Sequence, residues 1–168
     1  MLKKIFCALL LLCGGACSAN RETAFVRYCP NVYMNPTADH ITEMGGKVAM
    51  YKAKLIGYEG YCRNNAKTGE TYAMIAPIFE VVRYSDVIGS KVFFYYYTDT
   101  SANRDKGMGR AVREFSADVP QVGQKTTVKG AFAAVRIPNN MPGYRIELGI
   151  SLSPAQQNYN LKNGLSAR

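Results

Sequence analysis

Apolar and polar residues alternate over much of this chain, which is the pattern of β-strands that bury one face. The alternation is clearest in Tyr144–Leu152, where every second residue is apolar and the residues between are Arg, Glu, Gly and Ser. Val92–Tyr97 is predicted to be a strand with aromatic residues on both faces. Weaker alternation predicts strands over Val48–Tyr58, with an extended continuation to Cys62, and over Arg110–Val119 and Gln124–Ile137. In the last segment, Phe132 and Ala134 are expected to share one face with Val128 and Gly130.

Two other strands follow from composition and from proline. Thr71–Tyr84 is apolar almost throughout, which is typical of a central strand, and Pro77 within it predicts a bulge or a bend. Cys29–Met34 is expected to form a short edge strand, because Pro30 has no N–H to donate to a ladder. Residues 35–46 are expected to form a connection.

A helix is predicted after the last strand. Ser153 suits the N-cap position, Pro154 suits the first helical position, and Gln156 completes a capping box. The helix is expected to cover an open end or an edge of the fold, with Tyr159 and Leu161 packing against it.

These elements predict an all-β fold, an antiparallel Ig-like or fibronectin-like β-sandwich of about seven strands with a short C-terminal helix. "Ig-like" describes the architecture alone, because the chain has no Trp and so lacks the Cys…Trp…Cys core of antibody domains. The β-sandwich domain is expected to span residues 28–162, with the capping helix at 154–162 and a tail at 163–168.

The start of the chain has the pattern of a secretory signal peptide. Lys3 and Lys4 form a positive region, Ile5–Leu12 is an unbroken apolar run, and small residues follow. The run is too short to cross a hydrocarbon core, which needs about 20 residues. Residues 1–16 are therefore predicted to be removed on export, and residues 17–27 to form a tether.

Cys17 is predicted to be lipidated, because Gly15 and Ala16 before it resemble a bacterial lipobox. The third residue before a lipobox cysteine is usually Leu, and here it is Gly14. Ordinary signal peptidase cleavage, before Cys17 or before Asn20, therefore stays open and would leave a soluble periplasmic protein. Acyl chains would anchor the protein stably to a membrane. Because the residue after the cysteine is not Asp, the expected location is the periplasmic side of the outer membrane.

The five cysteines fall into three groups. Cys7 and Cys13 are expected to leave with the leader, and Cys17 is the candidate acylation site. Cys29 and Cys62 remain in an oxidising compartment and are predicted to form a structural disulfide that joins an early strand to its neighbour. Redox-active pairs usually have CxxC spacing and metal sites need more ligands, so we expect neither function for this pair.

The chain is strongly basic. Its formal net charge of +9 becomes +7 when Lys3 and Lys4 leave with the leader. This excess is interpreted either as a solubilising, non-specific charge or as a preference for anionic neighbours such as lipid headgroups, cell-wall polymers or an acidic protein. The exported location disfavours nucleic acid. The densest basic cluster contains Arg104, Lys106, Arg110 and Arg113. It is interpreted either as an anion-binding tip or as charge that protects a strand end from sheet-to-sheet pairing.

Sequence patterns for catalysis are few. His40 is the single histidine of the chain and is expected in a loop, and no GxSxG, HExxH or P-loop pattern occurs in the sequence. We therefore expect no enzymatic activity, no cofactor and no metal. The aromatic run Phe93–Tyr97 is interpreted as a strand buried on both sides, with an exposed binding face as the alternative.

A resemblance rests on motifs near the two ends of the chain. The leader ends in a cysteine, and the later motifs are Cys29-Pro30-x-Val32, Gly60-x-Cys62 and Leu152-Ser153-Pro154-x-Gln156-x-x-Tyr159-Asn160. This order resembles a group of uncharacterised Gram-negative periplasmic lipoproteins with a lipobox-type cysteine, a CPxV…GxC pair and a closing Leu-Ser/Thr-Pro-x-Gln-x-x-Tyr-Asn motif. The resemblance implies lipidation of Cys17 and implies no particular activity.

The sequence therefore favours a lipid-anchored structural or protein-interaction module of the cell envelope that performs no catalysis. Its expected partners are a membrane, through the N-terminal lipid, and an envelope protein. The alternative is a binding module for an anionic envelope polymer or lipid, which would act through the basic tip at residues 104–113.

Processing of the leader can be tested on the protein purified from membranes of its natural host. We expect the intact mass of a chain that begins at Cys17 and carries acyl groups. A soluble product beginning at Asn20 would favour ordinary signal peptidase cleavage, and a product that retains Met1 would contradict export itself.

Overall fold

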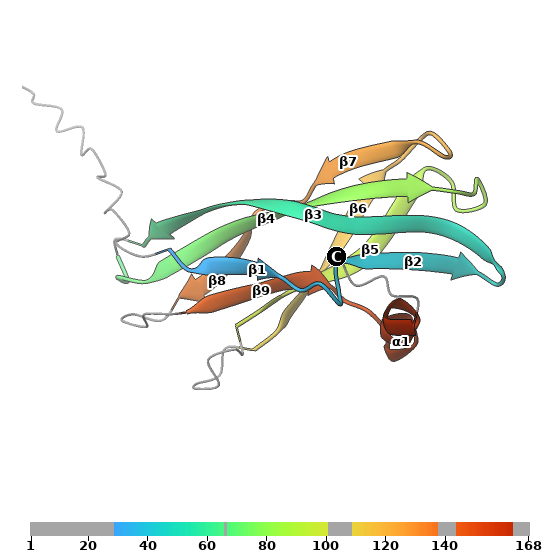
Figure 1. The fold of residues 1–168 in the computed structure, drawn as a ribbon. Helices are drawn as coiled ribbons and strands as arrows, with labels where there is room; N and C mark the ends of the chain where they lie inside the picture. The colour runs from blue at the N-terminus through green and yellow to red at the C-terminus, as the bar shows by residue number, and fades with distance from the viewer. Residues whose placement is uncertain (1–28, 66, 101–108, 138–143, 163–168) are drawn as a thin grey trace, which may run out of the picture.

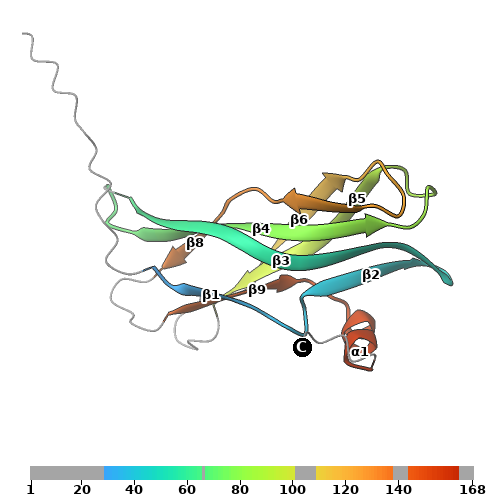
Figure 2. The same cartoon turned by 45° about the horizontal axis from the view of Figure 1, so that its top comes forward.

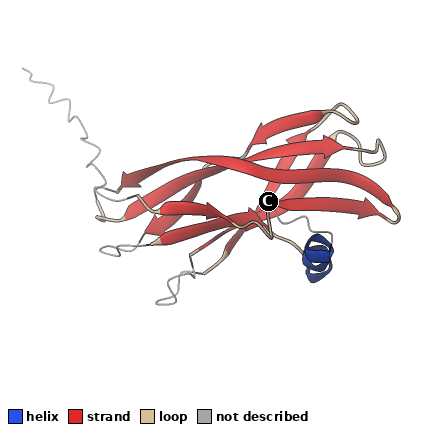
Figure 3. Cartoon of the chain, viewed as in Figure 1, coloured by secondary structure: helices blue, strands red, loops and turns tan. Residues whose placement is uncertain are grey.

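Strands make up most of the structure, and one short helix lies near the C-terminal end (Figure 3). The computed structural model describes residues 29–65, 67–100, 109–137 and 144–162. Within these ranges the elements in chain order are β1 (Asn31–Met34), β2 (His40–Gly45), β3 (Val48–Asn64), β4 (Thr71–Arg83), β5 (Lys91–Asp99), β6 (Ala111–Asp118), β7 (Lys125–Lys129), β8 (Ala133–Ile137), β9 (Arg145–Ile150) and α1 (Pro154–Lys162).

The strands form two sheets that lie face to face (Figures 1 and 2). One sheet has the order β1-β9-β5-β6, and the other has the order β2-β3-β4-β7, with β8 also paired to β4. All of these pairs are antiparallel except β1 and β9, which run parallel. The predicted all-β class and the short C-terminal helix are confirmed, and the parallel pair departs from the predicted antiparallel pattern.

Three aromatic rings form the centre of the core between the sheets. The Phe79 ring on β4 lies 4.9 Å from the Phe94 ring on β5 and 4.7 Å from the Phe115 ring on β6, measured between centroids. Because β4 belongs to one sheet and β5 and β6 to the other, these contacts join the two layers. Ring pairs of this kind contribute about 0.5–1.5 kcal/mol each beyond the burial of their apolar area.

Two strand predictions at the ends of the domain are confirmed. Ile146, Leu148 and Ile150 on β9 are fully buried, as the period-two alternation requires. β1 lies at the edge of its sheet, and Pro30 immediately precedes it, where a missing N–H costs no ladder hydrogen bond.

The central strand β4 accommodates Pro77 at a change of partner. β4 pairs with β8 over Thr71–Ile75 and with β7 over Ile78–Val82, so Pro77 falls between the two ladders. The irregularity predicted at this proline lies instead in the neighbouring strand, where β3 shifts its register between Leu55 and Gly57. The proline is thus tolerated because no ladder on that side needs its N–H.

The predicted connection over residues 35–46 is wrong, because it contains strand β2. His40 therefore lies on a strand, where it is buried beside Asp39, and not in a loop. The polar residues of this segment hide the strand in the sequence, since Ile41 is its one residue in the buried apolar core.

The single strand predicted over residues 124–137 is also wrong, because the chain forms β7 and β8 with a break between them. The break reverses the alternation, so Ala133 and Val135 are buried while Phe132 is exposed. Gly130 lies in the break between β7 and β8, close to Pro77 of β4. A Cβ added to Gly130 would lie 3.0 Å from Cγ of Pro77, too close for most side chains. With β2, this split brings the described strands to nine, where about seven were predicted.

The capping of α1 is confirmed. The Ser153 backbone N–H donates to Oε1 of Gln156 at 2.9 Å, and the Gln156 backbone N–H donates to Oγ of Ser153 at 3.3 Å. The helix lies against edge strand β2 as predicted, since Nδ2 of Asn160 donates to the carbonyl oxygen of His40 at 3.0 Å. The predicted packing of Tyr159 and Leu161 is wrong, because these two side chains are exposed and Asn160 is buried instead. Among the described residues, no helix is both long and apolar enough to cross a membrane.

A disulfide joins Cys29 to Cys62, with an S–S length of 2.04 Å and Cα atoms 5.8 Å apart. Cys29 lies two residues before β1 of the four-stranded sheet, and Cys62 lies on β3 of the five-stranded sheet. The predicted bond is confirmed. The expectation that it joins neighbouring strands is wrong, because it links the two sheets.

Loss of this disulfide should destabilise the domain. Its two cysteines are 33 positions apart in the sequence. In the chain-entropy description, opening a loop of that size lowers the free energy of unfolding by about 3–4 kcal/mol. We expect the double variant Cys29→Ala/Cys62→Ala to unfold at a lower urea concentration than the wild type, and reductant to lower the wild-type midpoint similarly. Equal thiol counts with and without reductant would contradict the bond.

Candidate functional site

A pocket of about 710 Å³ opens between the two sheets, near the end of the fold that carries α1. It is lined by residues of β2, β3, β5, the β4–β5 turn, the β9–α1 connection and α1 itself. Figures 1 and 2 show α1 at one end of the molecule and the start of β1 at the other. The long strands β3 and β4 run between these two ends. Its volume falls in the range of about 300–1,000 Å³ typical of ligand sites.

The pocket exists because β9 is shorter than its neighbour β5. β9 pairs with β5 over Tyr96–Asp99, and the chain then turns away from the sheet after Ile150. The first half of β5, Lys91–Tyr95, therefore pairs with β6 on one side and has no strand on the other. The pocket fills the place that a longer β9 would occupy.

The walls of the pocket are mainly apolar. Ile41 and Met50 come from the five-stranded sheet, Phe94 comes from β5, and Ile88 comes from the β4–β5 turn. Met44, on the exposed end of β2, completes the apolar lining. Such a surface favours apolar groups of a ligand or a partner, because their burial removes apolar area from water.

A few polar groups stand in this apolar lining. The Tyr51 hydroxyl donates to the carbonyl oxygen of Phe93 at 2.6 Å, and Nε2 of Gln156 donates to Oε2 of Glu43 at 3.3 Å. Burial raises the pKa of Tyr51 well above its ordinary value, and the nearby Glu43 carboxylate raises this pKa further. Tyr51 therefore stays protonated and remains a hydrogen-bond donor at neutral pH. Lys91 is exposed at the rim.

Two aromatic side chains rim the pocket on the outer face of β5. Phe93 is 62% exposed and Tyr95 is 49% exposed, whereas Phe94, Tyr96 and Tyr97 are buried. The prediction that the whole run is buried on both sides is therefore wrong for Phe93 and Tyr95, which belong to the alternative of an exposed face. Exposed aromatic residues beside an apolar pocket are typical of binding surfaces.

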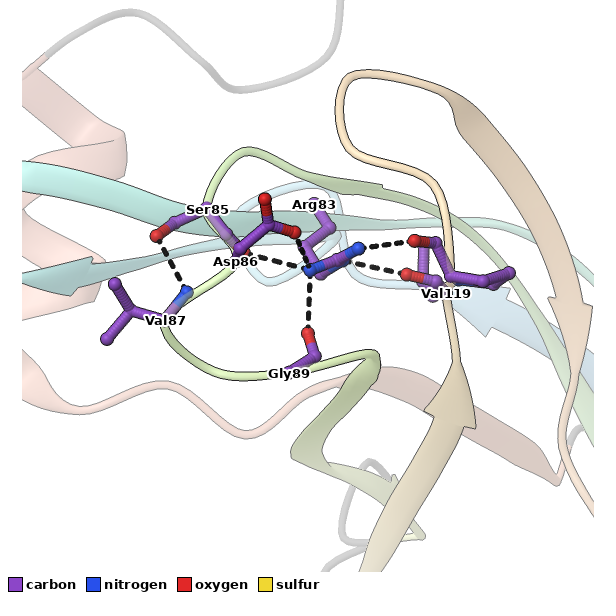
Figure 4. Close-up of polar contacts among 7 residues, drawn as sticks. Arg83, Ser85, Asp86, Val87, Gly89 and Val119 are labelled. Carbon is purple, nitrogen blue, oxygen red and sulfur yellow. Dashed lines mark hydrogen bonds and ion pairs between the residues drawn. The ribbon is translucent and has the colours of Figure 1, made fainter.

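Arg83 holds the turn that forms one wall of the pocket (Figure 4). This guanidinium is almost completely buried, and its Nε donates to the Val119 carbonyl oxygen at 2.8 Å. Its Nη1 donates to the Gly89 carbonyl oxygen and to Oδ1 of Asp86, both at 2.8 Å, and its Nη2 donates to the Pro120 carbonyl oxygen. One side chain thus joins the β4–β5 turn to the chain that leaves β6.

A buried Asp–His pair, Asp39 and His40, lies at the start of β2. Oδ1 of Asp39 and Nδ1 of His40 are 2.6 Å apart, and both residues are buried. Nε2 of His40 has no hydrogen-bond partner among the described residues. The described part of the chain places no serine, threonine or cysteine in hydrogen-bond contact with this histidine, so the pair lacks the nucleophile of a catalytic triad there.

The structure places two members of the predicted basic cluster at the opposite end of β5. Cζ of Arg110 lies 3.5 Å from the centroid of the Tyr97 ring, and its Nε lies 4.0 Å from Oδ2 of Asp99. Nη1 of Arg113 donates to Oγ1 of Thr98 at 3.0 Å. Both arginines thus contact their own chain, while Arg104, Lys106 and Cys17 lie outside the described residues.

Tyr97 anchors this second cluster. Its hydroxyl donates to Oε1 of Glu147 at 2.6 Å, and Nδ2 of Asn35 donates to the Tyr97 hydroxyl at 3.0 Å. Burial raises the pKa of Tyr97 to about 12, and its hydrogen bond to Glu147 contributes to the shift. Gly149 makes room for the ring, since a Cβ there would lie 2.7 Å from the Tyr97 hydroxyl oxygen.

The described ranges contain no group of three or more His, Cys, Asp or Glu side chains placed to hold a metal ion. Comparison with known proteins finds no match, since no family model, no curated protein and no solved structure is similar to this chain. The site must therefore be interpreted from its own geometry.

The sequence did not predict the pocket, because the pocket arises from a mismatch in strand length. β5 has nine residues and β9 has six. The capping box at Ser153 and Gln156, directly after the last apolar alternation, was the available signal that β9 ends early. It marks the end of the strand but does not say which neighbour continues beyond it.

Replacing Arg83 with Lys should destabilise the fold markedly. A lysine has one nitrogen and cannot reach the carbonyl oxygens on both sides of the guanidinium, so buried acceptors would lose their donors. We expect Arg83→Lys to lower the free energy of unfolding by about 3 kcal/mol in urea titrations. Arg136→Lys is the matched control, because Arg136 is exposed and pairs with Glu70 at 2.7 Å on the surface. Equal effects of the two changes would contradict the role of Arg83.

Proposed function

We propose that this protein is a lipid-anchored module of the Gram-negative cell envelope that binds a partner protein at the pocket beside β5 and catalyses no reaction. The observation that carries the proposal is this apolar pocket with its two exposed aromatic rim residues. Lipidated Cys17 would hold the protein at the periplasmic side of the outer membrane. The resemblance of the sequence motifs to periplasmic lipoproteins supports this location.

We interpret the architecture as an Ig-like or fibronectin-like β-sandwich. The two sheets, the predominantly antiparallel pairing and the aromatic contacts between the layers support this interpretation. Sandwiches of this kind place their loops at the two ends, where partners bind without disturbing the core. The pocket lies at one such end.

The position of the pocket relative to the proposed lipid anchor supports a role in binding a partner protein. The proposed anchor precedes β1, and the pocket lies at the end of the fold opposite the start of β1 (Figure 1). A tether of residues 17–27 would span at most about 35–40 Å when extended. The pocket would then be within reach of proteins of the periplasm.

The net charge of the exported chain favours an acidic partner. An anionic polymer or lipid bound at residues 104–113 stays an untested alternative. The contacts of Arg110 with Tyr97 and of Arg113 with Thr98 already use part of that cluster within the chain.

The anchor and the contact site can be tested separately. Cys17→Ser should move the protein from the membrane fraction to the soluble periplasmic fraction, because the acyl chains are lost.

Met44→Glu places a charge in the pocket lining and should reduce the yield of a chemically cross-linked, mass-identified partner at least tenfold. Met34→Glu is the matched control, since Met34 is also exposed but lies on β1. Equal yields from both variants would contradict the pocket as the contact site.

A further inference from the structure

We infer that the pocket binds an extended segment of the partner protein as an additional strand beside β5. This strand would lie in the space beside the first half of β5 that no strand occupies once β9 has ended at Ile150, which we call the lane. This inference rests on the proposed function, because it states how the partner of that same site is held. It differs from a general apolar contact in one respect: backbone hydrogen bonds of β5 would carry the recognition.

The ladder of β5 shows which of its backbone groups point into the lane. In an antiparallel pair, successive residues direct their N–H and C=O groups to opposite neighbours. The Ser151 N–H donates to the Tyr95 carbonyl oxygen at 2.7 Å, on the β9 side, and the Val119 N–H donates to the Ser90 carbonyl oxygen at 2.7 Å, on the β6 side. The backbone N–H and C=O groups of the odd-numbered residues of β5 therefore point toward the β9 side. Phe93 thus directs both its N–H and its C=O into the lane.

The acceptors along this open edge already have substitute donors. The Tyr95 carbonyl oxygen bonds to the last backbone N–H before the chain leaves the sheet, that of Ser151. The Phe93 carbonyl oxygen bonds to the hydroxyl of Tyr51, which reaches across from the facing sheet. Phe93 pairs with Ser116 of β6 at a non-hydrogen-bonded position, and no hydrogen bond from the Phe93 N–H is found among the described residues. An added strand would supply that acceptor.

The dimensions of the lane fit a short strand. Because Ser151 already lies opposite Tyr95, the open stretch is Lys91–Phe94, and four residues extend over about 13 Å in a β-strand. An added segment would direct alternate side chains inward, toward Ile41 and Met50, and outward, beside Phe93 and Tyr95. We therefore expect a segment of four or five residues that is apolar at every second position.

The charges of the rim specify one more feature of the segment. Lys91 is exposed at the end of the lane distant from β9, whereas Glu43 is already hydrogen-bonded to Gln156. A carboxylate on the partner segment beside Lys91 would complete the charge pairing. A lipid acyl chain could fill the apolar volume, but it would leave the aligned Phe93 amide without an acceptor. A lipid is therefore the competing outcome.

The occupant can be captured at position 93 in cells that carry the full-length protein. The photo-reactive amino acid p-benzoylphenylalanine replaces Phe93, and the control carries it at Leu161, an exposed position on α1. We expect cross-linking at position 93 to a single segment of one protein, apolar at alternate positions and with an acidic residue at one end. A lipid adduct, or equal yields at positions 93 and 161, would overturn the inference.

The backbone contribution is separated by two substitutions at the same position. Phe93→Ala keeps the N–H, and Phe93→Pro removes it without breaking the β6 ladder, which uses the even-numbered residues. We expect the proline variant to capture the identified partner at least tenfold less than the alanine variant. Equal capture by both variants would overturn strand addition while leaving the proposed function intact. If the wild-type protein captures no partner, both the strand addition and the proposed function are contradicted.

Amide hydrogen exchange of the wild-type protein keeps the test valid if the proline variant does not fold. Partner binding should slow exchange of the Phe93 amide at least tenfold and leave that of Phe94, which lies in the β6 ladder, unchanged. An unchanged Phe93 exchange rate in the complex would overturn the inference.

Discussion

The Phe79 ring is the contact on which the two-layered structure depends. It lies on the central strand β4, which pairs with β3, β7 and β8, and its ring meets Phe94 and Phe115 of the facing sheet. Because β4 lies between β3 on one side and β7 and β8 on the other, its mostly buried side chains form the middle of this layer and face the other sheet. The near-continuous apolar run of residues 71–84 is the sequence expression of this constraint.

Most of the strands could be predicted from the sequence, because they follow a local rule. A strand with one buried face has apolar residues at every second position, and these residues are the buried ones. In β9 they are Ile146, Leu148 and Ile150. β2 could not be found in this way. It begins with the polar residue His40, whose ring contacts Asp39 and whose carbonyl oxygen accepts from the amide of Asn160 on the distant helix α1.

The pairing of strands, in contrast, is a property of the whole chain. At the split between β7 and β8, Gly130 lies against Pro77, more than fifty positions earlier, and donates its N–H to the Pro77 carbonyl oxygen at 2.8 Å. The pocket depends in the same way on the difference in length between β5 and β9. The disulfide could be predicted by elimination among five cysteines, but not that it links the two sheets. Local patterns thus predict elements, and tertiary contacts decide the site.

The disulfide has a mechanical consequence. It enters the fold at Cys29, before the four-residue strand β1, and passes to Cys62 on the seventeen-residue strand β3. Tension applied to the N-terminal segment would therefore be transmitted through a covalent bond to the longest strand, bypassing the few hydrogen bonds that hold β1. The edge strand would be shielded from load, and the sheets would resist being peeled apart from the end at which the chain is held.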